Sequence, residues 1–168
     1  MSLYQPSAQV EPTFKNYLQE LYAETEDPAS TTSFTDFFTP NGSLIVLQYT
    51  AVGAERITGL KHALMPKDGS KLWHHVPNVT DVYADTTWNK IYEVKGVIQT
   101  TYQGGNCSQA YYSTRFTVAK DNDNKPILAL RAGSLLSYDD YIVEPSVSPT
   151  EIPCQGAMSS LTFHAGQL

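Results

Sequence analysis

The sequence predicts an α+β fold, in which helices precede a meander of antiparallel strands. In the first third of the 168 residues, apolar side chains recur every three or four positions, which is the period of a half-buried helix. From Leu72 onward the period changes to two, which is the period of a strand with one buried face. Short turns rich in Gly, Asn and Asp separate the later runs, as expected for neighbouring antiparallel strands.

Three helices are predicted before residue 66. The first has Pro12 near its start and is broken at residues 26–30; its buried face carries Phe14, Tyr17, Leu18, Leu21 and Tyr22. A second, short helix places Phe34, Phe37 and Phe38 on one side and ends at the turn sequence of residues 40–42. A third helix covers Glu55 to Met65 and is stopped by Pro66.

The strands begin with a buried run from Leu44 to Tyr49, between the second and third helices. After Leu72, strands are predicted at about residues 90–102, at 109–118 and at 127–138, and residues 121–124 form a turn. With the strand that opens near Leu72, these make four consecutive strands joined by short turns, which indicate an antiparallel, curved sheet.

Composition excludes several classes of function. Eleven Lys and Arg against 17 Asp and Glu give a net charge of −6 with no basic stripe, so neither nucleic acid nor an anionic membrane is an expected partner. No apolar run approaches the roughly 20 residues of a membrane span. The first residues lack the pattern of a secretory signal, so a cytoplasmic location is expected. Cys107 and Cys154 fit no zinc spacing and either pair or stay free; no metal or cofactor is expected.

The segment from Trp73 to Val79, Trp-His-His-Val-Pro-Asn-Val, is the main functional signal. An imidazole titrates near neutral pH, and His74 stands where a long strand enters the domain. This placement suits a proton-transfer group, and it equally suits a buried histidine bonded to a backbone carbonyl. His75 is expected to face solvent or an interface.

Several segments together resemble the nuclear transport factor 2-like cone fold, especially its fungal SnoaL-like and scytalone dehydratase-like branch. They are Leu21-Tyr22-Ala23 with Glu26-Asp27-Pro28, residues 37–45, Gly53 ahead of a helix, residues 74–79 and Tyr138-Asp139-Asp140. The resemblance covers about Phe14 to Tyr141. It implies an N-terminal extension (1–12), a SnoaL-like cone domain (13–144) and a Pro/Ser-rich C-terminal tail (145–168).

In that family, three helices pack in a strongly curved, mostly antiparallel sheet that forms a cone around an apolar pocket. The resemblance implies a homodimer through the outer sheet face, with Arg115 and Arg131 near that interface. A one-residue slip in register would swap the two faces. The implied inward residues are His74, Val76, Tyr112, Thr114, Phe116, Leu128 and Leu130.

The family's enzymes dehydrate, isomerise or cyclise hydrophobic small molecules without a cofactor, here plausibly in fungal secondary metabolism. By position in the motifs, His74 resembles a general acid–base, Asp27 the group that orients it, and Tyr112 a hydrogen-bond donor in the pocket. Gln48 or Tyr49 would polarise the substrate. The remaining implied ligand-binding residues are Tyr22, Thr114 and Phe116.

Two departures leave the enzyme assignment open. The second histidine of scytalone dehydratase is absent, because the corresponding region reads Gln-Thr-Thr-Tyr at residues 99–102. Isomerase chemistry would need a carboxylate on an inward strand position, and the meander offers Asp81, Asp85 and Glu93. The strand alternation places Asp81 and Glu93 on the outer face. Asp27 could simply terminate the first helix, and Tyr112 could be a core residue. The alternative function is therefore a non-catalytic ligand-binding or dimeric scaffold protein of the same fold.

Overall fold

The structure is a computed structural model that describes residues 1–105 and 107–142, with side chains through residue 140. The predicted tail at 145–168, with Cys154, lies outside these residues. Cys107, at the start of the sixth strand, is disulfide-bonded.

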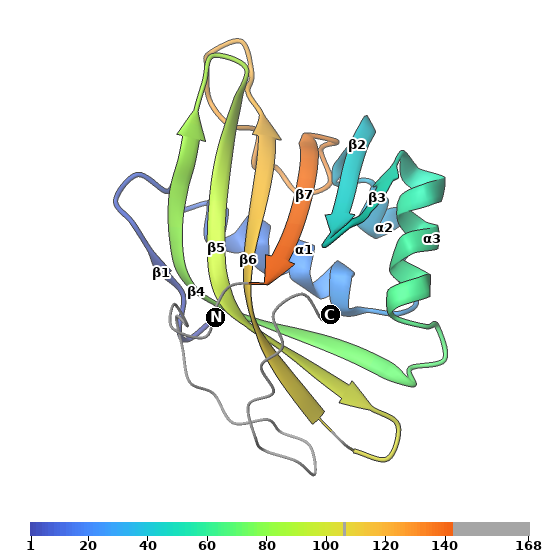
Figure 1. Cartoon of the computed structure of the whole chain (residues 1–168). Coiled ribbons are helices and arrows are strands. Elements are labelled where there is room, and N and C mark those ends of the chain that lie inside the picture. The colour runs from blue at the N-terminus through green and yellow to red at the C-terminus, as the bar shows by residue number, and fades with distance from the viewer. Residues whose placement is uncertain (106, 143–168) are drawn as a thin grey trace.

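One seven-stranded sheet forms the body of the molecule, in the order β1-β4-β5-β6-β7-β2-β3 (Figure 1). The pairs β2–β3, β4–β5, β5–β6 and β6–β7 are antiparallel, whereas β1–β4 and β2–β7 are parallel. The strands are β1 (Gln5–Pro6), β2 (Phe38–Val46), β3 (Tyr49–Val52), β4 (Lys71–Asp85), β5 (Asn89–Tyr102), β6 (Cys107–Ala119) and β7 (Leu135–Ile142).

The helices are α1 (Phe14–Glu26), α2 (Thr32–Thr35) and α3 (Ala54–Leu64). The first and third predicted helices are confirmed to within about one residue at their ends. The second is much shorter than predicted, because Phe38 already belongs to β2. The predicted turn at residues 40–42 is wrong, since these residues lie inside β2, where its register against β7 shifts between Phe38 and Ser43.

Two further strand predictions fail at their boundaries. The run from Leu44 to Tyr49 is divided by a turn at Leu47, whose φ is 55°, so it ends β2 and begins β3. The predicted strand from residue 127 to 138 begins only at Leu135, and Leu130, expected inside, is 39% exposed. Both errors concern pairing with strands that are distant in sequence, which a local pattern does not contain.

The α+β class and the mostly antiparallel sheet are confirmed. The third helix follows the first strand run, as the order along the chain predicted. The predicted packing of three N-terminal helices in a strongly curved sheet is not confirmed, and the sheet is not strongly curled. In Figure 1, α1 lies across one face of the sheet behind β5 to β7, and α3 lies beside β3 at the edge.

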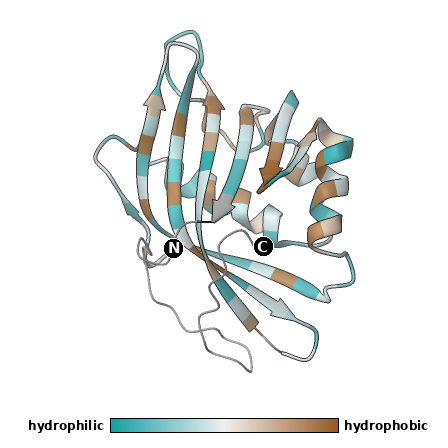
Figure 2. Ribbon diagram, in the orientation of Figure 1, coloured by the Kyte–Doolittle hydropathy of each residue, from teal (hydrophilic) through white to brown (hydrophobic). Residues whose placement is uncertain are grey.

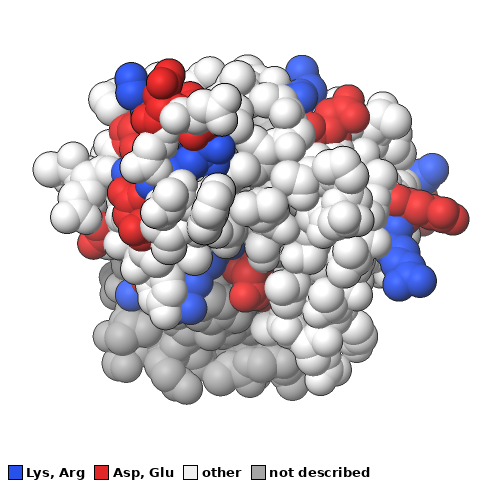
Figure 3. All heavy atoms as spheres, turned by 90° about the horizontal axis from the view of Figure 1, so that it is seen from above, with Lys and Arg blue, Asp and Glu red and all other residues white. Residues whose placement is uncertain are grey.

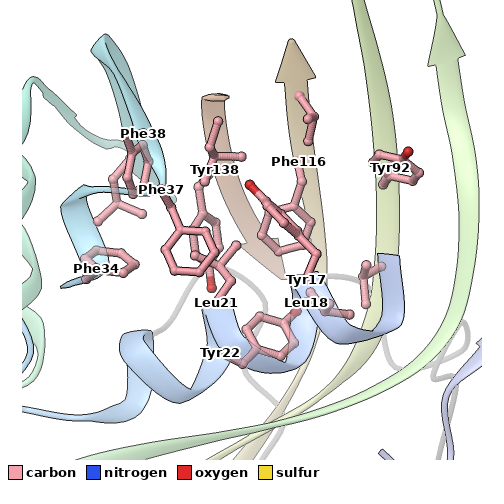
Figure 4. Packing of buried hydrophobic residues seen from close by; sticks show 14 of the residues in the cluster. Tyr17, Leu18, Leu21, Tyr22, Phe34, Phe37, Phe38, Tyr92, Phe116 and Tyr138 are labelled. Atoms are coloured by element: carbon pink, nitrogen blue, oxygen red, sulfur yellow. The ribbon is translucent and has the colours of Figure 1, made fainter. Parts of the chain in front are cut away.

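The core lies between α1 and the sheet and is mainly aromatic. Figure 4 shows Tyr17, Leu21 and Tyr22 reaching from α1 toward Phe116 and Tyr138 on the sheet. Phe14 stacks on Tyr92 of β5 at a ring-centroid distance of 4.0 Å. Figure 2 shows the alternation of hydrophobic and hydrophilic residues along β4 to β6 that gives the sheet its buried face.

The surface carries charges of both signs. On the face shown in Figure 3, Lys and Arg lie beside Asp and Glu rather than in a continuous basic patch. Among the described residues, no helix is both long enough and apolar enough to cross a membrane.

Candidate acid–base site

A single carboxylate joins the end of α1 to the histidine pair of β4. Glu26 is the last residue of α1, where the negative end of the helix dipole disfavours an anion, so its charge needs local donors. His74 Nδ1 lies 3.3 Å from one carboxylate oxygen, and His75 Nδ1 lies 3.1 Å from the other. The backbone N–H of His75 donates to that second oxygen at 2.5 Å.

These contacts assign the tautomers of both imidazoles. An ionised carboxylate only accepts hydrogen bonds, so each Nδ1 carries a proton. Burial alone would raise the pKa of Glu26, but the hydrogen bonds from His74 and His75 outweigh it and lower that pKa to about 2. The same hydrogen bond raises the pKa of His74 above its usual value, partly opposed by burial.

The two histidines face opposite sides of β4, and the predicted assignment is reversed. The side chain of His74 is 58% exposed, whereas that of His75 is fully buried. The prediction that His74 points inward is therefore wrong. The inward face of β4 carries Trp73, His75 and Pro77. His75 pairs with Ile98, which is itself in the core, and the register of β4 against β5 shifts only after Pro77.

The inner nitrogen of His75 is the distinctive atom of the site. Its Nε2 is buried and has no hydrogen-bond partner among the described residues. Because Nδ1 holds the proton, Nε2 of the neutral ring carries a lone pair that can accept one. A buried acceptor without a partner destabilises the folded state by about 1–3 kcal/mol. Such an atom in a native structure calls for an explanation, and a catalytic role is one.

Two buried tyrosines surround the His75 ring. The Tyr22 ring stacks on it at 4.3 Å between centroids and 12° between planes, and Tyr112 meets it edge to face at 5.5 Å. The hydroxyls of Tyr22 and Tyr112 are hydrogen-bonded at 3.0 Å. Burial raises the pKa of both phenols well above 10, so they stay neutral hydrogen-bond donors. The predicted inward positions of Tyr22 and Tyr112 agree with their burial.

Gly96 makes room for Tyr112. Gly96 is a residue of β5 and pairs with Tyr112 of β6. A Cβ atom there would be 2.2 Å from the Val76 carbonyl oxygen, 2.8 Å from Tyr112 Cε1 and 2.9 Å from the Tyr112 hydroxyl oxygen. Only glycine allows this close approach of strand and ring.

Two cavities adjoin the histidine pair. One of about 170 Å³ is lined by residues of α1 and β4 and by Met1, and one of about 330 Å³ is lined by residues 1–3, the histidines and Gln99. Met1, His74 and His75 border both cavities, so the two cavities are neighbours. Tyr112 itself is fully buried, and Tyr22 and His75, which pack against it, are each 4% exposed.

The other predicted site residues lie elsewhere. Asp27 follows Glu26, but its carboxylate accepts from the Ala29 N–H at 2.9 Å, as in the helix-terminating alternative. Gln48 and Tyr49 are exposed at the β2–β3 turn, so neither lines the histidine site.

Thr114 and Phe116 do face inward, and they lead to a carboxylate that the sequence analysis missed. Phe116 is fully buried in the aromatic core, and Thr114 donates to Asp140 at 2.6 Å. Asp140 is 2% exposed and pairs with Thr114 across β6 and β7. Its signal was the alternation of Tyr138 and Asp140 on one strand face. Glu26 was missed because it lies 48 residues from His74, and no local pattern joins them.

The Glu26 geometry predicts the acid stability of the protein. The folded pKa of about 2 lies below the ordinary 4.5, so the stabilisation is present above pH 4.5 and is lost as the pH falls toward 2. A pKa difference of that size corresponds to about 3 kcal/mol. Urea unfolding of Glu26→Gln is expected to lose this part of the pH dependence, whereas Glu20→Gln on the same helix keeps it. Equal acid slopes in wild type and Glu26→Gln would contradict the assignment.

Among residues 1–105 and 107–142, no group of three or more His, Cys, Asp or Glu side chains is arranged to hold a metal ion.

Solved structures of other proteins have a similar fold at low sequence identity. ActVI-ORFA from Streptomyces coelicolor superposes with a TM-score of 0.60 at 10% identity, covering 77% of this chain and 94% of that one. A candidate scytalone dehydratase from Novosphingobium aromaticivorans gives 0.60 at 7% identity, covering 79% and 83%. A Catenulispora acidiphila protein in complex with S-DNPA gives 0.55 at 14% identity, covering 77% and 93%.

The chain thus shares the fold of these structures, which agrees with the nuclear transport factor 2-like fold that the sequence predicts. These three structures come from bacteria and do not support the predicted fungal branch. No family model matches the sequence, and no curated protein matches it.

Proposed function

We propose that this protein is a cofactor-independent lyase or isomerase that moves protons on a hydrophobic small molecule. The observation that carries the proposal is His75: a buried imidazole whose Nδ1 is held by Glu26 and whose Nε2 has no partner among the described residues. His75 replaces the exposed His74 as the proton-transfer group, and Glu26 replaces Asp27 as the group that fixes its tautomer.

The chemistry follows from the protonation states. Nε2 of His75 accepts a proton from a carbon next to a carbonyl, while a tyrosine hydroxyl donates a hydrogen bond to the carbonyl oxygen. In a dehydration, the electron pair of that C–H bond forms the double bond, and the C–O bond breaks. The departing hydroxyl takes the proton from His75 and leaves as water. In an isomerisation, His75 returns the proton to a different carbon.

The ionised Glu26 supports both steps. It faces the imidazolium that forms when Nε2 is protonated and stabilises that charge without taking the Nδ1 proton, since its own pKa is about 2. The stacked Tyr22 ring presents its electron-rich face to the same imidazolium. The cavity of about 170 Å³ beside Tyr22 and His75 is the entry point for the reacting group.

A turnover screen tests this proposal. Hydrophobic cyclic ketones and β-hydroxyketones are incubated with the protein in D₂O, and mass spectrometry follows deuterium uptake and loss of water. Wild type is expected to catalyse one of these changes, and Tyr112→Phe, which removes one hydroxyl of the donor pair, to slow it by about tenfold. Unchanged rates in Tyr112→Phe would remove the Tyr112 hydroxyl from the mechanism, and unchanged rates in Tyr22→Phe as well would remove the pair.

A second function has an observation of its own. Tyr112, Phe116 and Tyr138 are at most 1% exposed, and such burial suits a non-catalytic ligand-binding or scaffold protein. If compounds in the same screen raise the melting temperature and none is converted, this alternative is favoured. The homodimer through the outer sheet face, the cytoplasmic location and the role in fungal secondary metabolism stay predictions.

A further inference from the structure

Lys61, on α3, places a buried cation beside the C-terminal end of α1. Lys61 is only 4% exposed, and a lysine is rarely buried to this extent without compensating partners. The ammonium group donates to three backbone carbonyls, those of Glu24 at 2.8 Å, Asp27 at 2.6 Å and Ser30 at 2.8 Å. A lysine ammonium has three N–H donors, so all of them are used.

The three carbonyls lie before and after Glu26 in the chain, the residue whose carboxylate binds both histidines. Glu24 and Asp27 flank Glu26 at the C-terminal end of α1, where the last carbonyls of a helix have no intrahelical partner. A cation there also matches the negative end of the helix dipole. Lys61 therefore binds both the last turn of α1 and the chain that follows it.

Neighbouring contacts keep the ammonium in place. It lies 5.0 Å from the centroid of the Phe34 ring, and Ile57, one turn earlier on α3, is fully buried. Burial lowers the pKa of Lys61 to about 8, opposed by the carboxylates of Asp27 and Glu24. At neutral pH the side chain is therefore mostly charged and able to donate all three bonds.

We propose that Lys61 is a positioning residue: by binding the carbonyls on both sides of Glu26, it sets the Glu26 carboxylate against His74 and His75. It touches neither histidine and acts only through the backbone of α1. The inference deepens the proposed function, because it depends on Glu26 being the group that orients His75. Its test, however, requires no turnover.

The test is the NMR titration of His74 in the full chain, together with hydrogen exchange of the His75 amide. In Lys61→Met, Glu26 moves away, so the raised pKa of His74 falls toward the ordinary value of histidine. The His75 amide, which donates to Glu26, exchanges about tenfold faster than in wild type. Ile57→Ala is the matched control, because it destabilises the same helix without removing the carbonyl contacts.

Loss of stability alone would not support the proposal. It is overturned if Lys61→Met lowers the melting temperature as Ile57→Ala does but leaves the His74 titration and the His75 exchange at their wild-type values. If Lys61→Met does not fold, the same two measurements are made on Lys61→Gln, which keeps two N–H donors but loses the charge. If Lys61→Met changes the His74 titration and the His75 exchange as expected, but the screen finds no turnover, the positioning role is retained and the proposed enzyme function is rejected.

Discussion

Replacing His75 by asparagine is expected to lower kcat by about 100- to 10,000-fold on the substrate that the screen identifies. Asparagine can keep a hydrogen bond to Glu26, but it has no lone pair equivalent to Nε2 and does not titrate. The loss falls on kcat rather than on KM, because the proton is transferred in the transition state and not on binding. The measurement is kcat and KM for wild type and variant at one pH, with the isolated substrate.

His74→Asn is the matched control for this prediction. His74 contacts the same carboxylate at nearly the same distance, but its side chain is 58% exposed and lies on the other face of β4. Its replacement is expected to change kcat by less than about tenfold, through Glu26 alone. A larger loss in His74→Asn than in His75→Asn would reverse the assignment and restore the outward-facing histidine as the acid–base group.

Replacing Gly96 by alanine is expected to destabilise the protein by about 3 kcal/mol, at the upper end of the cost of an overpacked core. The added Cβ would lie 2.2 Å from the Val76 carbonyl oxygen, which is backbone of the neighbouring strand and cannot rotate away. It would also press on the Tyr112 ring, so the hydrogen bond between Tyr112 and Tyr22 is expected to lengthen or break. Urea unfolding gives the free energy, and the ring signals of Tyr112 report the displacement.

The control is a second glycine in a helix. Gly59 is exposed on α3, and a Cβ there would meet nothing within 4 Å. Gly59→Ala is expected to stabilise the protein by about 0.5–1 kcal/mol, because alanine loses less backbone entropy in a helix. Similar free energies of unfolding for Gly96→Ala and Gly59→Ala would show that β4 and β5 separate easily, contrary to the geometry.

Some of the site could be predicted because it follows from periodicity along one element. The face of α1 that carries Tyr17, Leu21 and Tyr22 is buried as its spacing predicts. The alternation on β6 likewise places Tyr112 and Phe116 inside. These assignments succeed because one turn of helix or two residues of strand repeat the same environment.

The central pair could not be predicted in this way. Glu26 and His75 are 49 residues apart, and the sequence analysis selected their neighbours, Asp27 and His74, in both cases. On a strand, one residue is the whole difference between the inner and outer face. At the end of a helix, one residue separates a carboxylate that reaches β4 from one that caps its own turn.

The sequence by itself determined the helices α1 and α3, the long strands β4 to β6, the α+β class and the presence of a histidine pair where β4 enters the fold. Tertiary structure alone decided which histidine is buried, since that depends on the pairing of β4 with β5 and on the register shift after Pro77. It also decided that Glu26, Lys61 and Asp140 belong to the interior. Their partners come from distant segments, and only packing and the need to satisfy buried charges bring those segments together.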